Sequence, residues 1–485
     1  MRFLNKKNVI VLLFIISLLS INFYYIKNIF LFFIEIIMSL FLLMILYFKK
    51  IKKIENQFLL FGSFFGLLFI IVIPFCKIPD ENAHFSRAYS ISNGEFISKE
   101  VNGEAYTLVP FKIQDICKVN NYNDYINGFK NKNIEKSFFS NTALYNFVVY
   151  IPQTIGILLS KCLNLNPLLM IYFSRLFNLI CYLSLIYFSI KIIPFFKEVI
   201  MTISLNPLVL QEGASISSDS LTISISIFLI SYLFYLYNKR ELLKNKEYFI
   251  LFVTSIICSL CKIVYLPLCF LIILLPNYKF LNKKDKIIKK YLIIISSIIV
   301  NLLWTKIASR YLIEYNPGVD SINQIKNIIN NPFRYLLIII RSFKYYGINY
   351  MKSLFGSYIS IYNVYLGNIY SSFSLIFLLF FSLFDNHKKD LITLKNKIYI
   401  ILVFLSIILL IFTSLYVQWT PLKNNVVEGV QGRYFIPLLL LIPYMLLNNK
   451  TNKIILNKSI FKSFLLIYLI FQNINAIILV VKAYL

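Results

Sequence analysis

The stretch that organises this chain is Lys77-Ile-Pro-Asp-Glu-Asn-Ala-His-Phe-Ser-Arg-Ala-Tyr-Ser-Ile-Ser-Asn-Gly94, which directly follows the apolar run 58–76. Pro79 predicts the start of a helix, because its missing N–H group is not needed in a first helical turn. Asp80 and Glu81 then fall in that first turn, where the positive end of the helix dipole stabilises carboxylates. The stretch therefore places two carboxylates where an apolar segment meets water.

Two further polar residues share the predicted face of this helix. His84 and Arg87 follow Asp80 at i+4 and i+7, and these spacings put all three side chains on one face. Gly94 is expected to end the helix, since glycine readily adopts the positive φ of a helix terminus. A carboxylate pair, an imidazole and a guanidinium together indicate a functional site. The alternative is a solvated, charge-balanced helix start.

The composition identifies the chain as an all-α polytopic membrane protein. It is 59% hydrophobic with a mean hydropathy of +0.72, and long apolar runs recur throughout. The net charge is +28, from 49 Lys and Arg against 21 Asp and Glu. Most of this excess lies in short segments between apolar runs, as the positive-inside rule describes. We therefore expect membrane lipids as partners and no nucleic acid.

About 13 apolar segments are expected to cross the membrane, since a crossing helix needs roughly 20 such residues. Segment 77–140 has eight basic and eight acidic residues and is expected outside, whereas the strongly basic runs are expected in the cytoplasm. The N-terminus is then cytoplasmic and the C-terminus outside. The basic runs are 49–53, 238–247, 279–290, 387–397 and 448–462. The expected crossings are 9–27, 28–48, 58–76, 167–190, 197–213, 219–238, 247–262, 263–276, 290–308, 367–384, 398–417, 434–448 and 463–482.

The apolar segment 141–162 is expected not to cross. An odd number of crossings must separate the outer segment 77–140 from the inner run 239–247, yet four apolar segments intervene. Segment 141–162 contains Pro152 and Gly156, so we interpret it as an outer-leaflet or re-entrant helix that completes the first external loop. The expected parts are then an N-terminal hairpin with its basic loop (1–57), a transmembrane core (58–308) with the external loop 77–166, an external amphipathic segment (309–366), and the last crossings (367–485).

Charged residues of later segments reach the same expected outer face. Asp219 opens a predicted crossing, where it is either a helix cap or a second acidic group of the site. Lys262 and Tyr265 lie at the outer tip of a predicted hairpin, and Lys262 either snorkels to the surface or binds phosphate. Arg175 lies inside a predicted crossing and is expected to pair with an acidic residue of an outer loop.

The stretch Gln431-Gly-Arg-Tyr-Phe-Ile-Pro437 enters a predicted crossing from outside. Gly432 permits close approach of the backbone, and the fork-shaped guanidinium of Arg433 suits a phosphate or a carboxylate. The alternative for Arg433 and Tyr434 is an anchor at the membrane interface, where both residue types are common.

The cysteines and the loops exclude other kinds of site. The seven cysteines are scattered, mostly inside apolar runs, so no disulfide framework is predicted. Cys258 and Cys261 form a C-x-x-C pattern within a predicted crossing, and we interpret them as small buried residues. No Gly-rich nucleotide loop and no large cytoplasmic domain are visible. A glycosyl donor, if the protein uses one, is therefore expected to be lipid-linked.

An ordered set of motifs resembles a bacterial family of predicted polytopic membrane proteins, which itself is similar to the GT-C superfamily of membrane glycosyltransferases. The motifs span about 360 residues and are more specific as a set than any one of them is alone. They are Pro79-Asp-Glu-x-x-His-x-x-Arg-Ala-Tyr89, Asn206-Pro207 leading to Ser217-Ser-Asp219, Lys262-x-x-Tyr-x-Pro267, and Gln431-Gly-Arg-Tyr-Phe-x-Pro437.

The resemblance implies a GT-C-like fold and an inverting glycosyltransferase at the outer face of a bacterial plasma membrane. It implies a polyprenyl-phosphate-linked sugar donor and a cell-surface glycan, lipid or protein acceptor. Asp80 would be the catalytic base, with Glu81 as its neighbour or as a ligand. Some GT-C enzymes need a divalent cation such as Mg²⁺ or Mn²⁺, and no convincing ligand set is visible here. The expected substrate-binding residues are His84, Arg87, Arg175, Asp219, Lys262, Tyr265, Gln431, Arg433 and Tyr434.

Three other functions stay open from the sequence. A flippase or transporter of glycan lipids would spread its charged residues through the membrane interior, whereas here most of them collect at one face. A polymerase or ligase of surface polysaccharide is a related enzyme that the motifs do not separate from a transferase. A catalytically silent relative would act as a scaffold.

Overall fold

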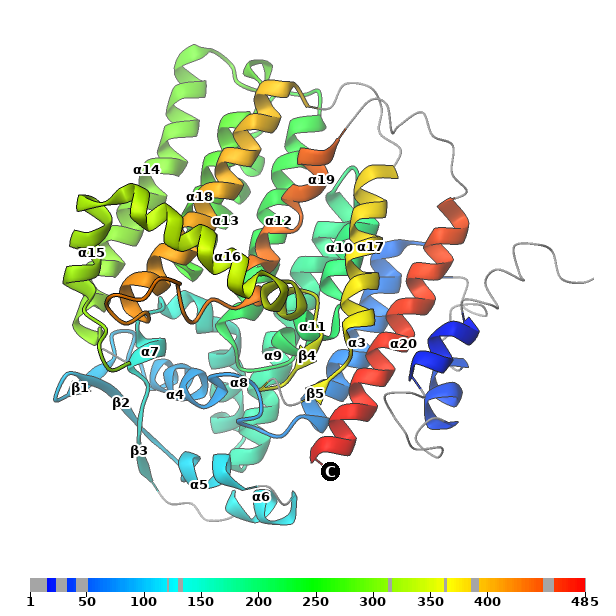
Figure 1. Ribbon diagram of the computed structural model, residues 1–485, viewed down its shortest axis with the longest axis vertical. Coiled ribbons are helices and arrows are strands. Elements are labelled where there is room, and N and C mark those ends of the chain that lie inside the picture. Colours follow the sequence, from blue (N-terminus) through cyan, green and yellow to red (C-terminus); the bar gives the residue numbers. More distant parts are fainter. Residues whose placement is uncertain are drawn as a thin grey trace, which may run out of the picture.

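Long apolar helices form a bundle, and shorter helices and strands cover one of its ends (Figure 1). Six helices in the described part of the chain are long and apolar enough to cross a membrane, as expected for a helical membrane protein. They are α3 (Ile54–Val72), α9 (Pro167–Ile192), α12 (Ser218–Asn238), α14 (Lys283–Ala308), α18 (Leu394–Gln418) and α20 (Lys458–Tyr484). The computed structural model describes residues 15–22, 33–40, 51–119, 122–129, 134–312, 316–361, 364–384, 392–447 and 458–484.

The other predicted crossings are shorter or broken, so the predicted count of about 13 is not established. Segments 197–213 and 434–448 each divide into two short helices. The predicted crossings 9–27 and 28–48 lie largely outside the described residues. The short elements are α10 (Lys197–Ser204), α11 (Pro207–Gly213), α13 (Asn245–Cys261), the 3₁₀ helices η2 (Ile263–Leu274), η3 (Asn277–Lys279) and η5 (Gly432–Leu438), α17 (Asn368–Phe384) and α19 (Leu441–Leu446).

Prolines and a capping asparagine explain these breaks. Pro207 opens α11, because a residue without an N–H group cannot continue the hydrogen bonds of α10. The Asn206 side chain caps α11 with its oxygen and donates its amide to the Phe355 carbonyl at 2.9 Å. Pro267 and Pro437 lie inside η2 and η5. At the first of these breaks, the capping side chain thus forms a hydrogen bond with a distant part of the chain.

The hairpin predicted around Lys262 is confirmed. Lys262 lies between α13 and η2, which pack against each other. At the opposite end of this hairpin the Leu243 amide donates to the Lys279 carbonyl at 2.8 Å. The two elements therefore run antiparallel, with Lys262 at the tip.

The segment after α3 folds over one end of the bundle, where it includes a small sheet that the sequence analysis did not predict. The strands are antiparallel in the order β1-β2-β3, with Lys99 opposite Tyr106 and Tyr106 opposite Phe138. The elements are α4 (Glu81–Ser92), β1 (Lys99–Val101), β2 (Glu104–Val109), α5 (Ile113–Lys118), α6 (Tyr122–Gly128), β3 (Glu135–Phe138), α7 (Ser140–Ala143) and the 3₁₀ helix η1 (Phe147–Tyr150).

Cys76 and Cys117 form a disulfide within this segment, with their Cα atoms 5.3 Å apart. The expectation that no cysteines pair is wrong here. Cys76 ends an apolar run and lies 41 residues before its partner, so spacing gave no signal. The bond ties the end of α3 to the layer that covers the bundle.

Helix α8 (Ile151–Cys162) continues directly from η1 and is shorter than the six long helices. Its 12 residues extend about 18 Å, and the expectation that segment 141–162 does not cross the membrane stays a prediction. The Thr154 hydroxyl donates to the Ala88 carbonyl of α4 at 3.3 Å. At Gly156 an added Cβ would lie 2.5 Å from the Phe173 carbonyl oxygen, so only glycine allows α8 to approach α9 this closely.

Residues 309–366 form a second layer at the same end (Figure 1). As predicted, its main helix is amphipathic, since Ile338 and Ile339 are buried while Arg341 and Lys344 are exposed. The elements are the 3₁₀ helix η4 (Ser309–Tyr311), α15 (Ser321–Asn330), α16 (Pro332–Leu354), β4 (Tyr358–Ile359) and β5 (Val364–Tyr365).

The last described helix ends beside the layer that contains α4. The hydroxyl groups of Tyr484 and Ser360 are hydrogen-bonded at 2.6 Å, and the Ser360 hydroxyl also contacts the Lys77 carbonyl oxygen. The hairpin bases near Leu243 and Lys279 lie at the other end of the bundle. The two ends therefore differ, with the basic runs 238–247 and 279–290 on one and α4 on the other.

Candidate functional site

Asp80 lies directly before α4, and its carboxylate does not cap this helix. The helix begins at Glu81, two residues later than Pro79 predicted. Asp80 has a left-handed backbone (φ 58°), which is uncommon outside glycine, and its side chain makes no capping hydrogen bond. That side chain is 54% exposed. The carboxylate is therefore held at a helix terminus without being used to stabilise it.

Glu81 has the opposite surroundings, although it is the next residue. Its buried carboxylate accepts hydrogen bonds from Arg175 Nε at 2.8 Å and Nη2 at 2.7 Å. It also accepts from the backbone amides of Cys76 and Ile216 at 3.3 and 3.1 Å. As expected, Arg175 pairs with an acidic residue of the segment 77–140. Both oxygens of Glu81 are engaged in a closed network.

Arg175 completes this network with the end of α3. Its Nη1 donates to the carbonyl oxygens of Ile70 and Ile73 at 2.9 and 2.7 Å. These carbonyls belong to the last turn of α3, where no backbone amide remains to satisfy them. Glu81 and Arg175 together therefore join α3, α4 and α9 at the point where the chain leaves the bundle.

His84 faces the site, whereas Arg87 does not. The His84 ring makes a hydrogen bond through Nδ1 with the Tyr150 hydroxyl at 2.7 Å and stacks on Tyr145. Burial lowers the pKa of His84 to about 4. Arg87 Nη2 donates to the Phe96 carbonyl at 2.7 Å, so its guanidinium fixes the loop after α4. His84 and Arg87 were predicted to share one face of α4, but their side chains lie in two different environments.

Asp219 and Lys262 form a second ion pair beside His84. Lys262 Nζ contacts Asp219 Oδ1, and both side chains are almost completely buried. Ser217 caps α12, so Asp219 lies within the first turn and its carboxylate is not a helix cap. Lys262 Nζ also lies 5.3 Å from the ring centroids of Tyr145 and Tyr434, a cation–π arrangement.

Arg433 connects three carboxylates from separate parts of the chain. Its Nη1 is 3.3 Å from Glu212 Oε1, its Nε 3.6 Å from Asp219 Oδ2, and its Nη2 3.9 Å from Asp80 Oδ2. The guanidinium is nearly buried and lies over the Tyr434 ring. Asp80, Glu212, Asp219, Lys262 and Arg433 form one cluster, which we call the charged cluster.

Glu212 is the member of the charged cluster that the sequence analysis did not place in the site. It lies in α11 and is almost completely buried. A carboxylate at the end of a predicted crossing is costly without a partner, and this was the available signal. The sequence analysis assigned the acidic role in this region to Asp219, seven residues later.

The two aromatic residues predicted with these cations lie beside them. The Tyr265 hydroxyl donates to the Tyr434 carbonyl at 2.8 Å and so joins η2 to η5. At Gly432, an added Cβ would lie 2.2 Å from the Tyr350 carbonyl oxygen, which explains why glycine stands before Arg433. Gln431 is outside the charged cluster and lines a neighbouring pocket described below.

An apolar groove of about 260 Å³ opens beside Lys262. Tyr265, Tyr434 and Trp304 contribute to its walls together with the ends of α14 and α18. Both helices expose many apolar side chains, as helices facing lipid do. The groove therefore connects an apolar surface to the ammonium group of Lys262.

A divalent cation does not fit the charged cluster as it is arranged. Across the described ranges, no three His, Cys, Asp or Glu side chains gather in a way that could hold a metal ion. Arg433 and Lys262 occupy the space between the carboxylates instead. A cation placed there would face two positive side chains, so we derive no step through a metal.

Comparison with protein families gives one match. The family described as "Predicted membrane protein (DUF2142)" matches residues 61–442, which contain every member of the charged cluster. Neither the curated proteins nor the solved structures give a match.

Proposed function

This chain belongs to the DUF2142 family of predicted membrane proteins, and we propose that it is a glycosyltransferase. It would move a sugar from a polyprenyl-phosphate-linked donor to a glycan, lipid or protein acceptor on the outer face of a bacterial plasma membrane. The proposal draws on the resemblance of the motif set to the GT-C superfamily. A polymerase or ligase of surface polysaccharide shares this resemblance and is the alternative enzyme.

The observation that carries the proposal is the state of Asp80. Its carboxylate is half exposed, caps no helix, and has the Arg433 guanidinium 3.9 Å away. Its left-handed backbone (φ 58°) is a conformation that aspartate adopts more readily than most non-glycine residues do. The exposed carboxylate can meet an acceptor hydroxyl, as a general base must, and the buried cation beside it can meet a phosphate.

Two features support an outer location for this site. The basic runs 238–247 and 279–290 lie at the other end of the bundle from Asp80, and the positive-inside rule favours the cytoplasm for such loops. The Cys76–Cys117 disulfide lies at the Asp80 end, and disulfides persist in oxidising compartments outside the cytoplasm.

The groove beside Lys262 suits the lipid-linked donor. Its apolar walls would take the first part of a polyprenyl chain arriving from the bilayer. The phosphate would then meet the Lys262 ammonium, which Asp219 and two tyrosine rings hold at the inner end of the groove. Arg433 lies on the far side of Asp219 and reaches Asp80.

The proposed step is a single displacement. The acceptor hydroxyl gives its proton to Asp80, and its oxygen forms a bond with the anomeric carbon of the donor sugar. The bond from that carbon to the phosphate oxygen breaks, and its electron pair stays on the polyprenyl phosphate. Lys262 and Arg433 would stabilise this charge. Attack from the side opposite the phosphate inverts the anomeric centre.

Substitution Asp80→Asn tests the proposal. We expect transfer from labelled polyprenyl-phosphate hexoses in proteoliposomes to fall about 10²–10⁴-fold, the usual contribution of a general base. The thermal unfolding midpoint should stay unchanged, because the side chain is exposed and caps nothing. Asp115→Asn is the matched control, since Asp115 lies in the same external segment and is 68% exposed.

Undiminished transfer by Asp80→Asn would refute the assignment. Labelled lipid that changes leaflet without a new glycosidic bond would favour a flippase.

A further inference from the structure

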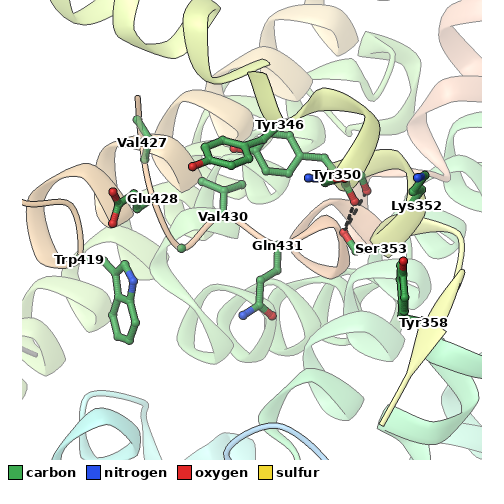
Figure 2. Close-up of a pocket in the computed structure, with 12 residues that line it drawn as sticks. Tyr346, Tyr350, Lys352, Ser353, Tyr358, Trp419, Val427, Glu428, Val430 and Gln431 are labelled. Carbon is green, nitrogen blue, oxygen red and sulfur yellow. Dashed lines mark hydrogen bonds between the residues drawn. The ribbon is translucent and has the colours of Figure 1, made fainter. Parts of the chain in front are cut away.

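A second pocket, of about 430 Å³, lies between α16 and the segment that leads from α18 to η5 (Figure 2). This volume is within the usual range for small-molecule sites. Four aromatic side chains line it, namely Tyr346, Tyr350, Tyr358 and Trp419. In the view of Figure 2, the Gln431 side chain lies between Trp419 and Tyr358.

The polar side chains of this pocket are mixed in kind and carry no net charge. Asn349 and Gln431 offer amide donors and acceptors, and Lys352 and Glu428 supply one charge of each sign. A phosphate or a carboxylate ligand would call for an excess of cations. A lipid chain would call for a wall that is mainly apolar, as in the groove beside Lys262. Aromatic faces with amide and hydroxyl partners suit a neutral ligand that has many hydroxyl groups.

The walls of the pocket are held in place before any ligand arrives. Gly429 has φ +79°, and an added Cβ there would lie 2.6 Å from the Trp419 ring, so the loop backbone packs directly on this side chain. The Gly432 amide donates to the Ser353 hydroxyl at 2.9 Å, which ties the start of η5 to α16. A preformed wall of this kind reduces the ordering cost of binding.

The pocket is directly linked to the charged cluster. Gln431 lines the pocket, and Arg433, two residues later, reaches Asp80. Successive Cα atoms are 3.8 Å apart, so these two positions are at most about 8 Å apart. The pocket and the charged cluster thus share the chain segment from Gln431 to Arg433.

We propose that this pocket binds a neutral carbohydrate, with sugar rings stacked on Trp419 and Tyr346 and with hydroxyl groups bonded to Gln431, Asn349 and Glu428. The proposal rests on the proposed function, within which this carbohydrate is the acceptor glycan. The pocket thereby indicates the chemical class of the acceptor, which the charged cluster alone does not indicate.

Trp419 offers a direct reading of binding, because the chain contains only two tryptophans. In a Trp304→Phe protein, Trp419 is the single tryptophan and lines the pocket. We expect at least one of maltotriose, mannotriose and triacetylchitotriose to change its fluorescence in a saturable manner. Sorbitol and uridine serve as a polyol control and an aromatic control.

Variants separate stacking from general effects. In the same background, Tyr346→Ala should weaken sugar binding about three- to tenfold, as expected for the loss of one ring contact. Tyr291→Ala is the matched control, since Tyr291 is exposed on α14 and lines neither pocket. The thermal unfolding midpoint of each variant shows whether it is folded. The proposal would be overturned if none of the three sugars caused a saturable change in fluorescence, or if uridine alone did so. It would also be overturned if the Tyr346→Ala protein bound the sugar as tightly as the Trp304→Phe protein does.

The outcomes for pocket and function are distinguishable. Asp80→Asn protein should bind the sugar normally while it transfers none. Sugar binding without transfer by the unsubstituted protein would retain the pocket and remove the proposed function. Transfer that is unaffected by Gln431→Ala and Tyr346→Ala would retain the function and remove the pocket as its acceptor site.

Discussion

The Arg175 guanidinium donates to both oxygens of Glu81, at 2.8 and 2.7 Å, across 94 residues of sequence. This pair fixes the start of α4 to α9 and to the last carbonyls of α3. Asp80 is consequently held at the mouth of the site while its neighbour is buried. Two adjacent carboxylates thus have separate roles, one in stability and the other in the proposed chemistry.

Glu81→Gln should destabilise the protein strongly, because it leaves the Arg175 charge buried without its partner. Breaking a buried ion pair costs about 3–5 kcal/mol, so we expect a clearly lower thermal unfolding midpoint in detergent. Asp80→Asn serves as the control at the adjacent position and should leave the midpoint unchanged. Equal midpoints for all three proteins would contradict the structural role of the pair.

Arg433→Gln should destabilise the protein, and a second substitution should restore much of the loss. The single change leaves the buried Glu212 carboxylate without its guanidinium partner. Glu212→Gln in the same chain removes the unpaired charge, so the double variant should be more stable than Arg433→Gln alone. A double-mutant cycle of unfolding midpoints measures this coupling. Strict additivity would show that the two side chains do not interact.

The double variant also separates stability from chemistry. Glu212→Gln with Arg433→Gln should still fail in sugar transfer, since it lacks the cation that the proposal gives to the phosphate and to Asp80. Arg433→Lys should transfer poorly as well, because an ammonium group cannot span three carboxylates as a guanidinium does. Full transfer by either variant would remove Arg433 from the proposed mechanism.

His84 predicts a loss of stability in acid. Burial lowers its pKa to about 4 in the folded protein, below the ordinary value of about 6.5 in the unfolded chain. The unfolded state therefore binds more protons between these values, and stability falls as the pH decreases from about 6.5 to about 4. The contribution is at most about 3 kcal/mol. His84→Gln, compared with the unsubstituted protein by unfolding midpoints across this range, should show a smaller acid loss. An identical pH dependence would exclude His84 as its source.

Cys162 reports which face of the membrane carries the site. It is an exposed free cysteine at the end of α8, beside α4. A membrane-impermeant maleimide should label it in intact cells, without permeabilisation. As the control, Lys246→Cys in a Cys162→Ser background places a thiol at the exposed start of α13, within the basic run 238–247, and it should be labelled only after permeabilisation. The reverse pattern would invert the orientation that the proposed function requires.

Composition and spacing were enough for the general architecture. The apolar runs predicted the long helices, because a membrane helix must satisfy its backbone within one continuous segment. Lys262 at a hairpin tip also followed from the sequence, since a charged residue between two apolar half-segments favours a turn there. The broken helices at Asn206 and inside η5 did not follow, because their backbone partners come from distant segments.

The apolar runs and their composition are sufficient to identify a helical membrane protein whose distinctive polar residues are Asp80, Asp219, Lys262 and Arg433. These residues stand out because charge within apolar sequence is costly. Their pairing became known from the folded structure alone. The folded structure closed Glu81 onto Arg175, added Glu212 to Arg433, joined Cys76 to Cys117, and left Asp80 exposed. Pairings of this kind depend on distances between segments that lie far apart in the chain, and local spacing contains no information about them.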